Sequence, residues 1–254
     1  MNRYLFRQAV KITSPVFFGY IAIGIPFGLM LVDKGYPWWM SLVMSATMYA
    51  GAGQYIAVGL FASGATLYTI AITELFVNIR HIVYGLSLIT PFKNVGKWKP
   101  YLIFALTDET YAIMTGVTVP KEAEPGKFYG AIALLDQSYW ILGSLIGAVA
   151  GRFIPSKYIG GVDFALCALF TVLLIEQIKK SKDFVPPVIG ILTTATAIVL
   201  NKVGILPSQH ILITAIALGI AAIVLVRGSH FTKSESSKKS TDSSGSTEKT
   251  EVKK

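Results

Sequence analysis

The chain has 254 residues, of which 53% are hydrophobic and only 15% are charged, and its mean hydropathy is +0.57. A soluble globular protein of this length cannot cover its surface with so few polar side chains, so the composition predicts a membrane protein. The net charge of +9 requires no nucleic-acid-binding surface, because most of the lysines and arginines flank apolar runs, where membrane proteins carry their cytoplasmic charge.

Eight apolar runs approach the roughly 20 residues that a helix needs to cross a bilayer. The links between them are short and rich in turn formers and charges, which leaves no room for a soluble domain. We therefore predict an all-α polytopic membrane protein with seven to eight crossings, a transmembrane transporter domain over residues 1–227, and a disordered Ser/Lys-rich tail over residues 228–254. The runs are 12–32, 40–62, 66–89, 101–118, 130–153, 160–178, 185–201 and 209–227.

Glycines four residues apart recur in the first run, at Gly24 and Gly28, and in the fifth, at Gly143, Gly147 and Gly151. This spacing places the glycines on one face of a helix and lets a second helix approach closely. We expect these faces to be packing surfaces.

The second run is predicted to be broken or re-entrant, because its centre reads Ala50-Gly51-Ala52-Gly53-Gln54. Glycine lowers helix stability, and unwound backbone at membrane depth persists only where it is buried in protein or lines a cavity. Half-helices of this kind hold substrate in secondary transporters. The alternative is an unbroken helix that packs closely through its small residues. The number of crossings, seven or eight, depends on this choice.

The third run carries polar side chains in an apolar context. Glu74, Asn78 and His81 follow helical spacing along one face, and Arg80 projects from another. Ionisable groups at bilayer depth are costly and usually face a cavity or a partner. Glu74 and His81 are candidates for proton coupling, with a structural hydrogen-bonding role as the alternative for His81. Arg80 either pairs with an intramembrane acid or binds a carboxylate of the substrate.

Adjacent acids, Asp108 and Glu109, lie near the centre of the fourth run, and Asp136 lies near the start of the fifth. Neighbouring residues face different sides of a helix, so one acid can pair with Arg80 while the other meets a cavity or takes up a proton. Loss of solvation favours the neutral form of a carboxyl group, which suits these acids to proton coupling.

Several catalytic signatures are absent from the sequence. It has no Walker-type loop, no HExxH and no serine elbow. The single cysteine, Cys167, allows no internal disulfide and no cysteine-ligated metal site. We therefore expect no enzyme and no cofactor, and transport energised by an ion gradient. The alternatives are a channel-like facilitator, a membrane enzyme using Glu74 and His81, and a scaffold for a partner that forms the pathway.

The ordered motifs resemble the AzlC family, the large subunit of bacterial branched-chain amino acid exporters. The resemblance covers roughly residues 8–226 and implies export of valine, leucine, isoleucine or toxic analogues across the bacterial plasma membrane, together with a small AzlD-like membrane subunit. The three basic residues near the amino end place the amino terminus in the cytoplasm. The motifs are Gly24–Gly28, Tyr49–Gln54, Asn78–His81 with Tyr84 and Gly85, Thr107–Glu109 with Tyr111, and Gly161–Ala165.

A zwitterionic amino acid needs a helix dipole or an arginine for its carboxylate, an acid for its ammonium group and an apolar wall for its side chain. Alternatively, the pathway serves another small solute. The candidate substrate-binding residues are Gly51, Gly53, Gln54, Asn78, Arg80, Asp108, Glu109 and Tyr111, and the candidates for proton coupling are Glu74, His81 and Asp136.

Overall fold

The computed structural model describes residues 3–159, 161 and 164–226, and within these residues it is helical with no strand. It divides into two compact units, residues 1–175 and 176–254. By length and composition, α1, α7 and α10 could each cross a membrane. The all-α membrane fold is therefore confirmed. The predicted tail, residues 228–254, lies outside the described residues.

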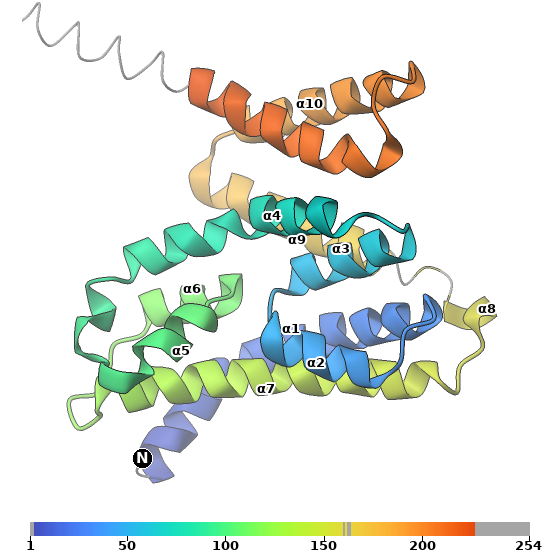
Figure 1. Ribbon diagram of the computed structural model, residues 1–254. Helices are drawn as coiled ribbons and strands as arrows, with labels where there is room; N and C mark the ends of the chain where they lie inside the picture. Colours follow the sequence, from blue (N-terminus) through green and yellow to red (C-terminus); the bar gives the residue numbers. More distant parts are fainter. Residues whose placement is uncertain (1–2, 160, 162–163, 227–254) are drawn as a thin grey trace, which may run out of the picture. The chain divides into compact units, whose positions relative to one another are not determined.

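The first unit contains most of the helices (Figure 1). Helix α9 (Phe164–Ser181) runs across the boundary between the two units. The helices before it are α1 (Arg3–Asp33), α2 (Trp39–Thr47), α3 (Gly51–Ala62), α4 (Leu67–Ser87), α5 (Lys99–Phe104), α6 (Asp108–Gly116), α7 (Pro125–Gly151) and α8 (Ser156–Ile159), with 3-10 turns at Pro91–Asn94 and Gly96–Trp98.

The second unit contains α10 (Val185–Lys202) and the helix Ile211–Val226, with a 3-10 turn at Ser208–His210 between them. The Asn201 amide closes the connection by donating to the carbonyl of Leu206 at 2.7 Å. The two helices meet where Gly219 faces the Thr193 hydroxyl. The last two predicted apolar runs are thus confirmed as helices.

Helices α1 and α7 pack closely along their length and run in the same direction (Figure 1). Thr13 and Tyr139 are in contact near one end of the pair, with their hydroxyls 3.2 Å apart. Further along, a Cβ added at Gly147 would collide with the carbonyl of Ile25, and one added at Gly28 would collide with the carbonyl of Ser144. The glycine faces of the first and fifth runs are therefore packing surfaces, as expected.

This packing predicts that Gly28→Ala lowers the stability of the folded protein by about 1–3 kcal/mol, because the added methyl forces the two helices apart. Gly19→Ala is the matched control on the same helix, because nothing lies within 4 Å of a Cβ at that position. The measurement is the thermal unfolding midpoint of each variant in detergent. Equal midpoints for the two variants would contradict the close approach of α1 and α7.

Helices α2 and α3 form a hairpin. Helix α2 begins, and α3 ends, at the end of the first unit where α1 ends (Figure 1). At its foot, the rings of Tyr36 and Phe61 lie 6.2 Å apart. At its tip, Tyr49 packs against Tyr20 in the middle of α1, at 6.5 Å. Tyr49 has a φ of 42°, a left-handed conformation in which the chain leaves α2 and turns into α3. The predicted break in the second run is confirmed, and the hairpin returns to the end from which it starts, as a re-entrant segment would.

Helices α5 and α6 form a second hairpin from the other end of the unit, where our expectation of one continuous fourth run is wrong (Figure 1). Trp98, at its foot, packs on Gly130 near the start of α7, while Thr107, at its tip, contacts the Tyr20 hydroxyl at 2.5 Å. The break has a local cause. Thr107 caps α6 by accepting a hydrogen bond from the Thr110 backbone N–H, and two acids in the first turn favour a helix start there.

The first six helices therefore repeat one pattern in opposite directions. Helix α1 is followed by the α2–α3 hairpin at its far end, and α4, which runs back, is followed by the α5–α6 hairpin at its own far end (Figure 1). Each half-helix has at most 12 residues, too few to cross a bilayer alone. Inverted repeats with discontinuous helices are a recurring architecture of secondary transporters, and their substrate sites lie where the broken helices meet.

Basic residues are unevenly divided between the two ends of the first unit. We call the end where α1, α5 and α7 begin the basic end. It carries eight lysines and arginines, against three at the opposite end. The eight are Arg3, Arg7, Lys11, Lys93, Lys97, Lys99, Lys121 and Lys127, and the three are Lys34, Arg152 and Lys157.

Candidate functional site

A small cavity of about 40 Å³ lies where the tips of the two hairpins meet α1, α4 and α7. A space of this size holds a few water molecules. One part of its lining is charged or polar, and another part is apolar. The polar lining is Tyr20, Tyr49, Arg80, Thr107, Asp108 and Glu109, and the rest is Ile23, Gly51, Ala52 and Trp140.

The amino terminus of α3 opens onto this cavity through Gly51 and Ala52. The first intrahelical hydrogen bond runs from the Gln54 N–H to the Ala50 carbonyl, and no side chain caps this terminus. The earlier N–H groups therefore keep their hydrogen-bonding capacity and the partial positive charge of a helix start. The buried Tyr49 hydroxyl beside them has no hydrogen-bond partner among the described residues. This part of the cavity suits an anionic group.

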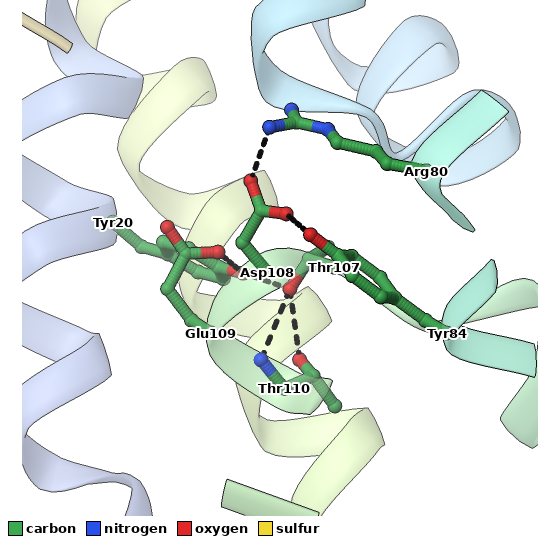
Figure 2. Close-up of polar contacts among 7 residues, drawn as sticks. All are labelled: Tyr20, Arg80, Tyr84, Thr107, Asp108, Glu109 and Thr110. Atoms are coloured by element: carbon green, nitrogen blue, oxygen red, sulfur yellow. Dashed lines mark hydrogen bonds and ion pairs between the residues drawn. The ribbon is translucent and has the colours of Figure 1, made fainter. Parts of the chain in front are cut away.

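Figure 2 shows Arg80 facing Asp108, and both residues line the cavity. Nη1 of Arg80 lies 2.8 Å from Oδ2 of Asp108, and the Tyr84 hydroxyl donates to Oδ1 of the same carboxylate at 2.5 Å. The ring of Tyr84 stacks on that of Tyr111 at 4.3 Å. Nε of Arg80 is buried and has no partner in the described structure. Arg80 therefore forms an ion pair and still has a free donor.

A second set of hydrogen bonds leads from the cavity into the protein (Figure 2). The Tyr20 hydroxyl donates to Oε2 of Glu109 at 2.9 Å. The same hydroxyl lies 2.5 Å from Oγ1 of Thr107, which donates to Oγ1 of Thr110 at 3.1 Å. Thr110 donates to Oδ2 of Asp136 at 2.8 Å, and both of these residues are fully buried. A continuous row of polar atoms thus joins the cavity to a carboxyl group inside α7.

Glu74 and Asn78 form a separate pair outside the cavity lining. The Asn78 amide donates to Oε2 of Glu74 at 2.9 Å. Both side chains lie against Gly53, where an added Cβ would collide with the Glu74 carboxylate. His81 lies one turn further on, edge-on to Tyr84 at 5.8 Å. Gly53 thus gives room for the pair to dock on α3.

Gln54 holds the first hairpin on α7. Its side-chain oxygen accepts a hydrogen bond from the Trp140 indole at 2.8 Å, and its amide donates to Ser45 at 3.3 Å. The Ser45 hydroxyl is 2.8 Å from that of Ser144. Gln54 is fully buried. Both ends of the amide are therefore used inside the protein.

The structure brings four of the predicted substrate-binding residues, Gly51, Arg80, Asp108 and Glu109, to one cavity. It places the other four, Gly53, Gln54, Asn78 and Tyr111, around that cavity rather than in its lining. Of the predicted proton-coupling residues, Asp136 connects to the cavity through hydroxyl groups, whereas Glu74 and His81 lie on α4 beyond its lining.

Sequence reasoning missed the aromatic and hydroxyl residues of the site, Tyr20, Tyr49, Thr107, Thr110 and Trp140. Thr107 had a usable signal. A threonine followed directly by two acids is a typical helix start, and its place inside an apolar run indicates a break there. Tyr20 and Trp140 carry no such local signal, because they reach the site only through the packing of α1 on α7.

Comparison with known proteins gives one family and several relatives. Residues 15–154 match the family model described as AzlC protein. A membrane protein of Helicobacter pylori is 36% identical over 87% of this chain and 95% of its own length. The branched-chain amino acid transport protein AzlC of Bacillus subtilis is 31% identical over 77% of this chain and 76% of its own. The inner membrane protein YgaZ of Escherichia coli is 30% identical over 70% of this chain and 75% of its own length. No solved structure matches.

Proposed function

The chain belongs to the AzlC family of membrane transport proteins, and from this premise we propose that it exports branched-chain amino acids across the bacterial plasma membrane. It would act as the large subunit beside a small AzlD-like membrane protein. The name of the Bacillus subtilis relative supports the substrate class. The amino terminus would be cytoplasmic, because the basic end carries eight lysines and arginines against three at the opposite end.

The observation that carries this proposal is the chemistry of the cavity between the hairpin tips. Arg80, through its unpaired Nε, and the open amino terminus of α3 would bind a carboxylate. Glu109 on the other side would bind an ammonium group. Ile23 and Trp140 would contact an aliphatic side chain. The cavity is small, so binding would require the hairpins to move apart, as alternating access demands.

The other candidate residues would act from the surroundings of the cavity. Gly53 and Gln54 would fix the position of α3, and Asn78 would do so through its contact with Gly53. Tyr111 would support Tyr84, which holds Asp108. Glu74 and His81 would remain candidates for proton uptake on α4. The sequence has no nucleotide-binding motif, so we propose that a proton gradient supplies the energy.

The test is efflux of labelled valine from preloaded cells that express the full chain with and without its small partner, at two external pH values. We expect efflux above that of the empty-vector cells, and its loss when the proton gradient is dissipated. Efflux that never proceeds against a valine gradient would point instead to a facilitator. Absence of valine, leucine and isoleucine efflux in the presence of the partner would refute the proposed substrate class.

A further inference from the structure

The row of hydrogen bonds that joins Glu109 to Asp136 has four contacts but only three hydroxyl groups to supply protons for them. We call the residues Glu109, Tyr20, Thr107, Thr110 and Asp136 the hydroxyl chain. They make four successive contacts, of 2.9, 2.5, 3.1 and 2.8 Å. A tyrosine or threonine has one hydroxyl proton, and an ionised carboxylate has none. Three hydroxyl protons cannot fill four hydrogen bonds.

With both acids ionised, one of the four contacts has no hydrogen, which is unfavourable between buried oxygens. If both carboxylates were ionised, Tyr20 would donate to Glu109, and Thr110 would donate to Asp136. The proton of Thr107 would then serve either Tyr20 or Thr110, and the remaining pair of oxygens would face each other with lone pairs only. The Tyr20–Thr107 contact of 2.5 Å lies at the short end of the O–H···O range and takes the proton of Thr107. The buried hydroxyl oxygens of Thr107 and Thr110, 3.1 Å apart, are then left with no hydrogen between them. One proton on either carboxyl group removes this mismatch.

We infer that Glu109 and Asp136 share one proton, which passes between them through the hydroxyls of Tyr20, Thr107 and Thr110. This inference rests on the proposed function and gives its coupling a route. In the step, the Glu109 carboxyl gives its proton to Tyr20, Tyr20 gives its own to Thr107, Thr107 to Thr110, and Thr110 to Asp136. Four O–H bonds break and four form, and the net change is one proton moved from the cavity to α7.

The placement of the two ends suits a coupling between substrate and proton. Glu109 is partly exposed and lines the cavity, whereas Asp136 is fully buried. An ammonium group binds well only to the ionised Glu109, so binding would send the proton to Asp136. The hydroxyl chain starts at Glu109 on α6, passes through Tyr20 on α1, and returns to the α5–α6 hairpin before it ends in α7. A movement of this hairpin would therefore break it and hold the proton at one end.

Other charged or titratable groups surround the two acids and would influence the pH at which the shared proton is lost. They are Tyr20 on α1, Tyr49 at the tip of the first hairpin, Arg80 on α4, Tyr101 on α5 and Asp108 on α6.

Infrared spectroscopy of the purified full-length chain tests the shared proton without any substrate. Glu109→Gln and Asp136→Asn should each remove one protonated carboxyl from the C=O stretching region, because the new amide N–H₂ supplies the fourth hydrogen and the remaining acid ionises. A variant that keeps the full wild-type signal would show that the two acids do not share a proton, and would overturn the inference.

Transport measurements test the route. Thr110→Val removes one hydroxyl at nearly constant volume, and we expect net valine efflux driven by the proton gradient to fall about 100-fold, as for loss of a positioned proton donor. Valine binding needs the proton to leave Glu109, so exchange of internal for external valine should fall as well. Thr110→Ser, which keeps the hydroxyl, should restore both efflux and exchange. Tyr20→Phe interrupts the same route at α1 and provides a second variant.

Tyr55→Phe is the matched control, because it deletes a buried tyrosine hydroxyl whose hydrogen bond, to the carbonyl of Ile23 at 2.7 Å, lies outside the hydroxyl chain. Unchanged efflux in Thr110→Val, or a Thr110→Ser variant as inactive as Thr110→Val, would overturn the route. Neither result would bear on the proposal that the wild-type chain exports valine. If the wild-type chain moves no valine, the proposed function fails, and the infrared result still decides whether the proton is shared.

Discussion

Valine efflux should fall about 100-fold when Arg80 is replaced by methionine. Removing one partner of a buried charge pair costs roughly 2–5 kcal/mol, and the Arg80–Asp108 pair, which is only partly buried, should lie near the lower end of that range. Arg80 lines the cavity, its guanidinium pairs with Asp108 at 2.8 Å, and its Nε has no hydrogen-bond partner in the described structure. Methionine removes both the ion pair and the donor. Efflux from preloaded cells measures the transport loss, and the yield of monodisperse protein measures folding.

A double variant separates the two roles of Arg80. In Arg80→Met with Asp108→Asn no charge is left unpaired, so we expect the folded yield to recover. Efflux should remain low, and valine should no longer raise the unfolding midpoint, because the donor for the carboxylate is still missing. Arg80→Lys should restore efflux only in part, since an ammonium group lacks the planar fork. Full efflux in the double variant would show that Arg80 serves only to neutralise Asp108.

The helices were predictable from the sequence because apolar length is a strong local signal. Gly51 and Gly53 also indicated the first break, since glycine weakens a helix wherever it lies. The second break, at Ala105–Thr107, carries neither glycine nor proline. It depends on Thr107 as a cap, a weaker signal that the apolar context of the fourth run concealed.

The assembly of the cavity was only partly predictable. Charged residues in apolar runs stand out individually, so Arg80, Asp108 and Glu109 were identified without a structure. Tyr20 and Thr107 resemble ordinary residues of a membrane helix. They meet at 2.5 Å because the glycine faces set the register of α1 on α7 and because the second hairpin turns back at Thr107. No pattern within a single run contains that information.

If both hairpins are re-entrant, the side of the membrane on which each loop lies is fixed and can be measured by cysteine labelling. We expect a cysteine at position 63, in the loop between α3 and α4, to react with an impermeant thiol reagent in intact cells. Cysteines at position 94, at position 122 and in an amino-terminal extension should react only after permeabilisation. The changes are Ser63→Cys, Asn94→Cys and Glu122→Cys, each in a Cys167→Ser background, and all three positions are exposed.

Two comparisons between labelled positions show separately whether each hairpin crosses the membrane. If α2–α3 crossed the membrane, the cysteine at 63 would lie on the same side as the amino terminus, whereas a re-entrant hairpin places it on the opposite side. If α5–α6 crossed, the cysteines at 94 and 122 would lie on opposite sides, whereas a re-entrant hairpin leaves them together. If all four labelling results were reversed, both hairpins would still be re-entrant, but the amino terminus would lie outside the cytoplasm. That outcome would contradict the excess of lysine and arginine at the basic end, which favours a cytoplasmic location.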